Sequence, residues 1–304
     1  METTVRRGRR AVRLTRLERL WWPDLGIRKA EVVDYYAALA PTLLPHVRDR
    51  PFTIKQHFTS PRSPFRWVKD APPGLPDWIP VAPQPARSRA GELVRYPLVN
   101  DELALLWMVE FGCVDLHVWT ARADKPDRPD FVLFDLDPAG VRFADVVAAA
   151  LGLRDALAAL GLAGVAMTTG GEGLHVRVPI ERRHTHADAR AFAEVVTGAL
   201  VRSAPGLVTT ETSRARRRGV FVDTKMNGHG QQVVAPYSVR PRPGAPVAAP
   251  LRWDELEEGL DPQAFTLSRV RARVERDGDL AAPLLHGRQR LASALALLRR
   301  LGRG

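Results

Sequence analysis

The chain has 304 residues, long enough to bury a core as one large domain or as two lobes. Lysine and arginine number 45 against 34 aspartate and glutamate residues, a formal net charge of +11 that favours a polyanionic partner such as nucleic acid. No run of about 18 apolar residues occurs, which argues against a membrane-spanning helix. No apolar segment follows the arginine-rich start, so we expect a cytoplasmic protein without a secretory signal.

Residues 1–12 are rich in arginine, and we expect them to form a disordered basic arm. A helix is predicted to start near Ile27, because apolar residues follow at the spacing of one buried helix face. Arg16, Arg19 and Lys29 lie at or before this start. Backbone N–H groups at a helix start favour anions, so the three cations could form a phosphate-binding cluster. They could equally be unrelated surface charges.

The sequence of residues 52–58 predicts a strand, with Lys55 on one of its faces. The following residues 61–85 are rich in proline, which predicts a mostly irregular excursion. This excursion carries aromatic and basic side chains, among them Trp67 and Lys69. Such side chains suit stacking and phosphate contacts with a single nucleic-acid strand. They could equally attach the loop to the body of the protein.

Residues 103–118 predict a helix that passes into a strand, with His117 near its end. A lone histidine there is more often structural than functional. The apolar strand 131–134 is followed by Asp135 and Asp137, which point to one side because strand side chains alternate. Two carboxylates on one face repel each other, and a divalent metal would stabilise them. Asp-x-Asp is also common at turns and helix N-caps, so that alternative stays open.

A second apolar strand over 164–169 breaks into a turn that contains Gly170, Gly171 and Glu172. The strand then resumes, and its alternation sets His175 on the face opposite to its apolar residues. A glycine-rich hairpin tip lets a phosphate approach the backbone closely, although it could also be an ordinary glycine hairpin. It lacks the Lys-Ser/Thr ending of a P-loop.

A helix is predicted over 188–202, preceded by His184 and His186 in what reads as a solvated loop. A basic loop around Arg216 then leads into an apolar strand that ends at Asp223. Strands and helices alternate through the middle and late chain, which indicates an α+β or mixed α/β fold.

Three ordered motifs resemble those of the archaeo-eukaryotic primase superfamily, and in particular the polymerase domain of the bacterial ligase D of non-homologous end joining. They are Phe134-Asp-Leu-Asp-Pro138, Thr169-Gly-Gly-Glu-Gly-Leu-His175, and Phe221-Val-Asp223 followed by Ala235-Pro-Tyr-Ser-Val-Arg240. The resemblance implies an α+β fold with a primase-like core of mixed and antiparallel sheets flanked by helices. It implies a single domain over 13–304, in which 13–120 holds a 5′-phosphate-binding region and the proline-rich loop, and 121–304 holds the catalytic core and C-terminal helices.

The activity implied by the resemblance is templated nucleotidyl transfer, with a preference for ribonucleotides, to primer 3′ ends at gaps or double-strand breaks. Asp135, Asp137 and Asp223 would hold two ions, Mn²⁺ or Mg²⁺, that activate the 3′-hydroxyl and stabilise charge on the triphosphate. The family positions near the incoming nucleotide are matched by Lys55, His117, Thr169, Gly170, Gly171, His175 and Arg240.

The resemblance also implies DNA-binding positions and partners. Arg16, Arg19 and Lys29 fall where the family binds the 5′-phosphate of a break or gap, and Arg216 lies in a loop used at broken ends; Trp67 and Lys69 are further DNA-binding candidates. The expected partners are gapped or broken DNA, nucleoside triphosphates, Ku, and a separate or fused ATP-dependent ligase. We expect a monomer associated with the nucleoid.

Several positions depart from the family pattern, among them Arg16 and Arg19 where Asn and Lys are usual, and Arg66-Trp67 where the family has an aromatic pair. Glu172 stands where lysine is usual, Met226 where glutamine is frequent, and Thr169 where serine is usual, with the hydroxyl retained. Two other hypotheses therefore stay in view. One is a catalytically weakened homologue that still binds nucleic acid, and the other is a metal-dependent nuclease or phosphohydrolase that uses the same aspartates.

Overall fold

The computed structural model describes residues 1–86, 91–287 and 289–301, which fold into two compact units. Unit 1 comprises Met1–Asp124, Gln232–Ala248 and Gln263–Asp279, and unit 2 comprises Lys125–Gln231, Ala249–Pro262 and Leu280–Gly304. The division differs from the expected one near residue 120, because two later segments return to unit 1; the expected end at residue 304 lies outside the described residues. In the described part, no helix is long and apolar enough to cross a membrane.

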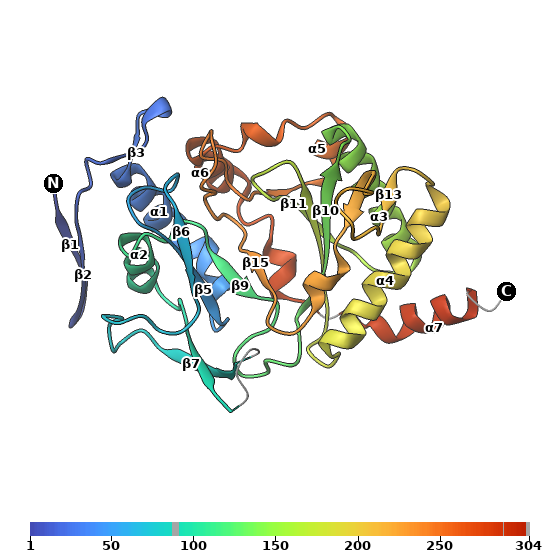
Figure 1. Ribbon diagram of the computed structural model, residues 1–304, viewed down its shortest axis with the longest axis horizontal. Coiled ribbons are helices and arrows are strands. Elements are labelled where there is room, and N and C mark those ends of the chain that lie inside the picture. Colours follow the sequence, from blue (N-terminus) through green and yellow to red (C-terminus); the bar gives the residue numbers. More distant parts are fainter. Residues whose placement is uncertain (87–90, 288, 302–304) are drawn as a thin grey trace. The chain divides into compact units, whose positions relative to one another are not determined.

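Unit 1 contains a four-stranded sheet in the order β15-β9-β5-β6, in which neighbouring strands are antiparallel. The hydroxyl of Tyr36 on α1 donates to the carbonyl oxygen of Val114 and accepts from the N–H of Val239 at 2.9 Å, which ties the returning segment to the unit. The elements are β1 (Thr3–Arg7), β2 (Arg10–Leu14), β3 (Leu20–Trp22), β4 (Ile27–Arg28), α1 (Lys29–Val47), β5 (Phe52–His57), β6 (Phe65–Val68), β7 (Val81–Pro85), β8 (Leu93–Pro97), α2 (Glu102–Glu110), β9 (His117–Trp119), β15 (Gln232–Val234) and α6 (Leu267–Asp277), together with the short helix η1 (Pro23–Leu25) (Figure 1).

The N-terminal residues form the hairpin β1-β2 in place of the expected disordered arm. The apolar residues on the inner face of β2 are buried. Two arginines of the hairpin form ion pairs with acidic residues at the start of α2. Arg7 contacts Glu102 at 2.9 Å, and Arg10 contacts Asp101 at 2.5 Å. The charges that suggested disorder therefore have partners on a distant helix. Likewise, the proline-rich stretch is less irregular than expected, because it contains β6, which pairs with β5.

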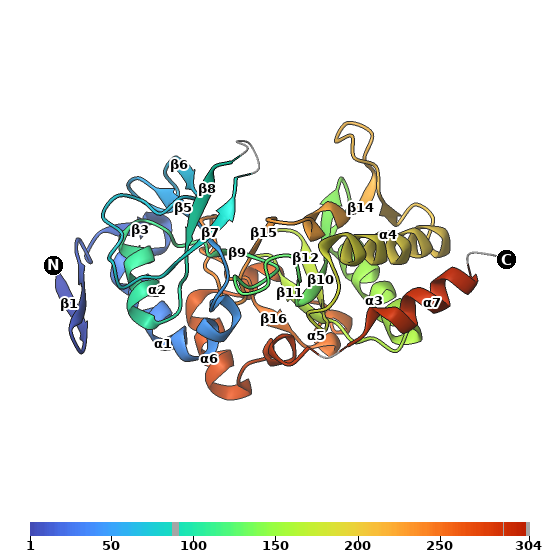
Figure 2. The same ribbon diagram turned by 90° about the horizontal axis from the view of Figure 1, so that it is seen from below.

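Unit 2 contains a six-stranded sheet in the order β13-β14-β10-β12-β11-β16, antiparallel except for the pair β13-β14. Helices α3 and α4 cover one face of this sheet, where Phe134 of β10 meets Phe192 of α4 with ring centroids 6.4 Å apart (Figures 1 and 2). The elements are β10 (Phe131–Ala139), α3 (Phe143–Ala159), β11 (Val165–Thr168), β12 (Leu174–Pro179), α4 (His186–Ser203), β13 (Val208–Thr209), β14 (Gly219–Val222), η2 (Thr224–Asn227), β16 (Pro250–Leu251), α5 (Trp253–Glu257), η4 (Ala282–Leu285) and α7 (Leu291–Leu301); η3 (Pro262–Ala264) joins the two units in sequence.

His186 is the first residue of α4 and is only 7% exposed, so the expectation of a solvated loop is wrong at this position. Its Nε2 lies 3.0 Å from the carbonyl oxygen of Pro126, and its Nδ1 lies 3.1 Å from that of Asn227. The hydroxyl of Thr185 caps the helix by accepting from the N–H of Asp188 at 3.1 Å. The histidine is thus fixed between two backbone segments of unit 2.

Candidate active site

Unit 2 carries the predicted aspartates on the sheet face opposite α3 and α4. Asp135 and Asp137 follow the buried apolar part of β10, and alternation along the strand turns both to this face. In the pairing with β14, Leu136 lies opposite Val222, and the N–H of Asp223 donates to the carbonyl oxygen of Asp135 at 2.9 Å. Asp223 therefore lies directly beside Asp135 on the neighbouring chain segment.

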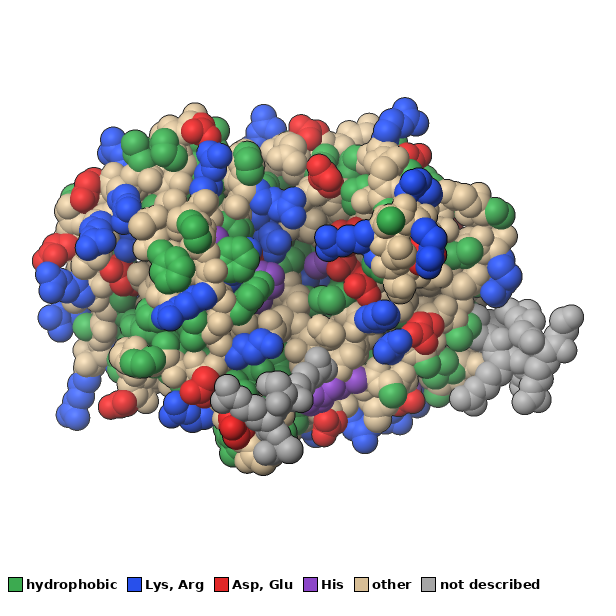
Figure 3. Space-filling view, in the orientation of Figure 1, with side chains coloured by type: hydrophobic (Ala, Val, Ile, Leu, Met, Phe, Trp, Pro, Cys, Tyr) green, Lys and Arg blue, Asp and Glu red, His purple; other side chains and the backbone are tan. Residues whose placement is uncertain are grey.

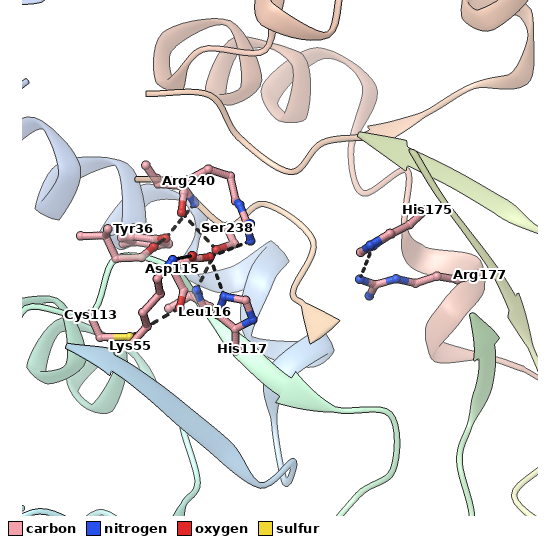
Figure 4. A network of polar contacts seen from close by, with 12 residues as sticks. Tyr36, Lys55, Cys113, Asp115, Leu116, His117, His175, Arg177, Ser238 and Arg240 are labelled. Atoms are coloured by element: carbon pink, nitrogen blue, oxygen red, sulfur yellow. Dashed lines mark hydrogen bonds and ion pairs between the residues drawn. The ribbon is translucent and has the colours of Figure 1, made fainter. Parts of the chain in front are cut away.

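His175 lies opposite Asp135 on the other neighbouring strand, β12. Its Nε2 is 3.2 Å from Oδ1 of Asp135. Its Nδ1 is 3.3 Å from a guanidinium nitrogen of Arg177, a contact drawn in Figure 4. Guanidinium nitrogens only donate, so Nδ1 accepts and Nε2 carries the proton that faces Asp135. His175, Asp135 and Asp223 thus form a row across three adjacent segments of the sheet.

The hairpin between β11 and β12 approaches β10 closely. The hydroxyl of Thr169 donates to the carbonyl oxygen of Gly173 at 3.1 Å, which closes the turn. A Cβ atom on Gly173 would lie 2.6 Å from the carbonyl oxygen of Leu136 and 3.0 Å from Oδ1 of Asp137. Glycine at this position therefore leaves room for the carboxylate of Asp137.

The remaining residues of this turn face different surroundings. Gly170 and Gly171 are buried, and Gly170 has a φ angle of 65°, in the left-handed region that glycine adopts readily. Glu172, by contrast, is exposed at the tip. Its negative charge is therefore screened by solvent, which limits its effect on a bound phosphate.

The chemistry of this face suits a divalent cation, because carboxylate oxygens are the ligands that Mg²⁺ and Mn²⁺ prefer. Among the residues that the structure describes, however, no three His, Cys, Asp or Glu side chains are close enough together to hold a metal ion. The three aspartates are thus aligned on one face without being gathered around a common point.

In unit 1, a fully buried carboxylate gathers three of the predicted nucleotide-binding side chains (Figure 4). Asp115 accepts hydrogen bonds from Arg240 at 2.8 Å and from Lys55 at 3.1 Å, and Nε2 of His117 lies 3.0 Å away. Burial raises the pKa of a carboxyl group, but the attraction of these neighbours outweighs it and lowers the pKa of Asp115 well below its usual range. The N–H of Leu116 donates a hydrogen bond to the hydroxyl oxygen of Ser238 at 2.8 Å.

Asp115 was missed by sequence reasoning. Its partners lie far from it along the chain, except for His117, and the available signal was an acidic residue within an otherwise apolar stretch. A buried carboxylate needs partners, so this signal could have predicted an ion-pair network.

Aromatic side chains of β6 surround the ammonium group of Lys55. Its Nζ lies 4.4 Å from the ring centroid of Phe65 and 5.7 Å from that of Trp67. Trp67 also meets His117 edge to face, with centroids 5.0 Å apart, and remains 47% exposed. Lys69 is exposed just beyond the end of β6. The structure therefore places Trp67 beside the predicted nucleotide-binding residues of unit 1.

Unit 1 also contains a cavity of about 260 Å³ that is lined by Arg16, Arg19 and Lys29 together. Lys29 is nearly buried and makes an ion pair with Glu110 at 2.5 Å and a 2.9 Å hydrogen bond to the carbonyl oxygen of Thr15. Within the described part of the chain, the guanidinium groups of Arg16 and Arg19 have no such partner. The three cations are therefore a cluster, and the two arginines supply its unbalanced positive charge.

Arg216 lies in the loop before β14 of unit 2, where its side chain is 73% exposed. Its Nε donates to Glu211 at 3.0 Å, and this hydrogen bond lowers the pKa of the Glu211 carboxyl group. The side chain that was predicted to contact broken ends is thus held by an acidic neighbour in its own loop.

Comparisons with known proteins agree with these features. The family model described as the LigD primase-polymerase domain matches residues 28–281. The chain is 33% identical over 281 residues to the multifunctional non-homologous end joining DNA repair protein LigD of Mycobacterium tuberculosis, covering 88% of this chain and 36% of that protein. It is 30% identical to LigD of Pseudomonas aeruginosa, covering 96% and 35%.

Among solved structures, the chain is similar to the polymerase domain of Mycobacterium tuberculosis ligase D in complex with DNA. The TM-score is 0.84 at 30% sequence identity, and the match covers 91% of this chain and 99% of that one. The chain spans about a third of the length of the curated relatives it matches. The predicted α+β fold with mixed and antiparallel sheets is confirmed by this structural match.

Proposed function

Because the chain belongs to the LigD primase-polymerase domain family, we propose that it extends primer 3′ ends at gaps and double-strand breaks in non-homologous end joining. Membership of this family confirms the predicted enzyme class, a DNA-directed nucleotidyltransferase. The metal dependence, the preference for ribonucleotides, the roles of individual residues and the cooperation with Ku and an ATP-dependent ligase are parts of the proposal.

The register of β10 between β12 and β14 is the observation that carries the proposal. It aligns Asp135, Asp137 and Asp223 on one sheet face, with His175 beside Asp135. We assign the three aspartates as ligands of two Mn²⁺ or Mg²⁺ ions. Bound divalent ions would neutralise the triphosphate and ease loss of the proton from the 3′-hydroxyl. His175 would orient Asp135 through the proton on its Nε2.

Lys55 and Arg240 carry more positive charge than Asp115 neutralises, so they remain attractive to a phosphate group. We assign both, with His117, to binding of the incoming nucleoside triphosphate. Thr169, Gly170 and Gly171 would approach the nucleotide through the hydroxyl and the backbone of the hairpin turn.

DNA binding is supported by the charge of the protein and by the cavity of unit 1. Lysine and arginine side chains are spread over the face seen in Figure 3, with acidic side chains between them. Arg16, Arg19 and Lys29 line one cavity, which we assign to the 5′-phosphate at a gap or break. Trp67, Lys69 and Arg216 are exposed and would contact the DNA strand.

Primer extension on a gapped duplex tests the proposal. The purified protein is incubated with Mn²⁺ and either ribo- or deoxyribonucleoside triphosphates, on gaps with and without a 5′-phosphate. We expect extension that is stronger with ribonucleotides and with the 5′-phosphate, and none with Asp137→Ala. Extension by Asp137→Ala would contradict the assignment of the aspartates. Shortening of the DNA without added nucleotides would favour a nuclease, and tight DNA binding without metal-dependent triphosphate binding would favour a weakened homologue.

A further inference from the structure

The side chain of Asn227 takes the place of a strand residue beside β10. It is 2% exposed and lies at the end of η2, the short helix that follows Asp223. Its Oδ1 accepts from the N–H of Leu133 at 2.8 Å, and its Nδ2 donates to the carbonyl oxygen of Leu133 at 2.7 Å. One side-chain amide thus satisfies both backbone groups of a residue in β10, as the N–H and C=O of one residue in an antiparallel partner strand would.

This contact continues the pairing of β14 after that strand has ended. The ladder between the two strands runs to Leu136 opposite Val222, and the N–H of Asp223 then donates to the carbonyl oxygen of Asp135 at 2.9 Å. The chain turns away into η2 and returns to β10 through Asn227. The segment 223–227 is therefore fixed to β10 at both of its ends.

The interior of the segment is held as well. Oδ1 of Asp223 accepts from the N–H of Lys225 at 3.0 Å, so one carboxylate oxygen is engaged at the start of η2. Nδ2 of Asn227 also donates to the carbonyl oxygen of Thr224 at 3.1 Å. The carbonyl oxygen of Asn227 lies 3.1 Å from Nδ1 of His186 on α4. The orientation of the Asp223 carboxylate therefore depends on a segment whose far end is anchored by Asn227.

We propose that Asn227 is a positioning residue for Asp223: by anchoring segment 223–227 to Leu133, it sets the Asp223 carboxylate beside Asp135 and so determines the affinity for a divalent cation. The inference rests on the proposed function, because that function makes Asp223 a metal ligand. Asn227 itself has no role as a ligand, since its amide oxygen and nitrogen are both occupied by β10. A purely structural asparagine would affect stability alone.

Asn227→Asp is the most direct variant. It keeps the size and the acceptor but removes the donor, and it sets a carboxylate against the carbonyl oxygen of Leu133. His186→Phe is a second variant, which keeps a ring but removes the contacts of His186 with the backbone carbonyl oxygens of Asn227 and Pro126. Asn100→Asp is the matched control, because Asn100 also makes two side-chain hydrogen bonds of 2.8 Å, both to Asp49 in unit 1.

The readouts are Mn²⁺ affinity of the full chain without DNA or nucleotide, kcat and KM for the nucleotide in gap filling, and thermal unfolding. For Asn227→Asp we expect Mn²⁺ binding about 10- to 100-fold weaker, the usual effect of losing a residue that orients a metal ligand. The value of kcat should fall, KM for the nucleotide should stay unchanged, and excess Mn²⁺ should restore the rate. His186→Phe should show a smaller loss of Mn²⁺ affinity. Asn100→Asp should lose stability and keep wild-type Mn²⁺ affinity.

Two outcomes separate the proposal from the function on which it rests. If the wild-type chain binds Mn²⁺ and fills gaps while folded Asn227→Asp and His186→Phe bind Mn²⁺ equally well, Asn227 does not position Asp223 and the proposed function stands. If the wild-type chain neither binds Mn²⁺ nor extends a primer, the proposed function fails and the inference fails with it. Should Asn227→Asp not fold, unchanged Mn²⁺ affinity of His186→Phe overturns the proposal.

Discussion

The guanidinium group of Arg240 donates a 2.8 Å hydrogen bond to the buried carboxylate of Asp115, although the two residues lie 125 positions apart in the chain. Lys55 binds the second oxygen of the same carboxylate at 3.1 Å. A single acidic side chain thus fixes the positions of two cations that we assign to the nucleotide. Asp115 is therefore expected to control nucleotide binding without contacting the nucleotide.

Asp115→Asn should lower kcat/KM for the nucleotide by at least about tenfold. Hydrogen bonds to charged groups contribute about 1.5 to 3 kcal/mol, and about 1.4 kcal/mol corresponds to a factor of ten. Steady-state gap filling measures the effect. The control is Asp70→Asn, which removes an exposed ion pair with Arg95 at 3.0 Å and should leave kcat/KM unchanged. Equal kcat/KM values for Asp115→Asn and wild type would show that Lys55 and Arg240 do not depend on Asp115.

Because of the same carboxylate, we expect the stability of the fold to depend on pH in the acidic range. The pKa of Asp115 is lower in the folded chain than the unfolded value of about 3.9. The folded state therefore binds fewer protons, so this group stabilises the fold above about pH 4 and loses its effect as the pH falls. Urea unfolding of Asp115→Asn should show a free energy of unfolding about 3 to 5 kcal/mol lower at neutral pH, because the fully buried ion-pair partner of two partly buried cations is lost. The difference from wild type should shrink below about pH 4. A difference that is constant across this range would exclude Asp115 as the titrating group.

The sequence was informative wherever a feature depended on neighbouring residues. The apolar run before Asp135, the glycine-rich turn before His175 and the helix of residues 188–202 all follow from local alternation or helical spacing, and the structure contains each of them. The row of His175, Asp135 and Asp223 additionally needed the order of three strands, which local patterns do not contain. The resemblance to a family implied that these residues share one site, and the order of the strands comes from the structure.

Features that depend on distant partners could not be predicted in this way. The arginines of β1 and β2 suggested a disordered arm because no acidic partners are apparent next to them in the sequence. Their partners, Glu102 for Arg7 and Asp101 for Arg10, lie about 90 residues further on. Asp115 is marked locally only as an acidic residue in an apolar stretch, and the local sequence around it or around Asn227 does not show which groups more than 50 residues away these side chains will bind. Buried polar residues are satisfied by tertiary contacts, which a single sequence does not show.

Arg216 should contribute to DNA affinity in a salt-dependent way. Its exposed ion pair with Glu211 is easily exchanged for a phosphate contact. Arg216→Ala should reduce the slope of log affinity against log salt concentration by about 0.9, the contribution of one phosphate contact. Glu211→Gln should tighten binding at low salt, because Arg216 is released. Fluorescence anisotropy with a labelled gapped duplex measures both effects. Arg271→Ala is the control, since Arg271 forms a comparable exposed pair with Glu275 on α6; an equal change in slope there would indicate a general charge effect.

Glu172→Lys should improve nucleotide binding. The substitution restores the charge that the family usually has at this turn, and a lysine attracts a triphosphate where glutamate repels it. Because Glu172 is exposed, screening limits the gain to about 1 kcal/mol or less, which corresponds to about a fivefold lower KM. The control Glu258→Lys makes the same charge change on an exposed residue after α5. If both variants lower KM equally, net charge rather than position explains the effect, and if neither does, the turn does not face the triphosphate.

Gly173→Ala should disturb Asp137 and the strand that carries it. A Cβ atom would lie 2.6 Å from the carbonyl oxygen of Leu136, a distance that forces the backbone of the hairpin or of β10 to move. We expect a loss of about 1 to 3 kcal/mol in the free energy of unfolding, together with weaker Mn²⁺ binding because the carboxylate of Asp137 is displaced. Gly198→Ala is the control on α4, where the Cβ atom would meet the Arg202 side chain at an ordinary 3.5 Å and should stabilise the helix by up to about 1 kcal/mol. Urea unfolding and Mn²⁺ titration of both variants test the prediction. If Gly173→Ala is destabilised but binds Mn²⁺ with wild-type affinity, the hairpin stabilises the fold without positioning Asp137. The position of Asp137 would then be determined by β10.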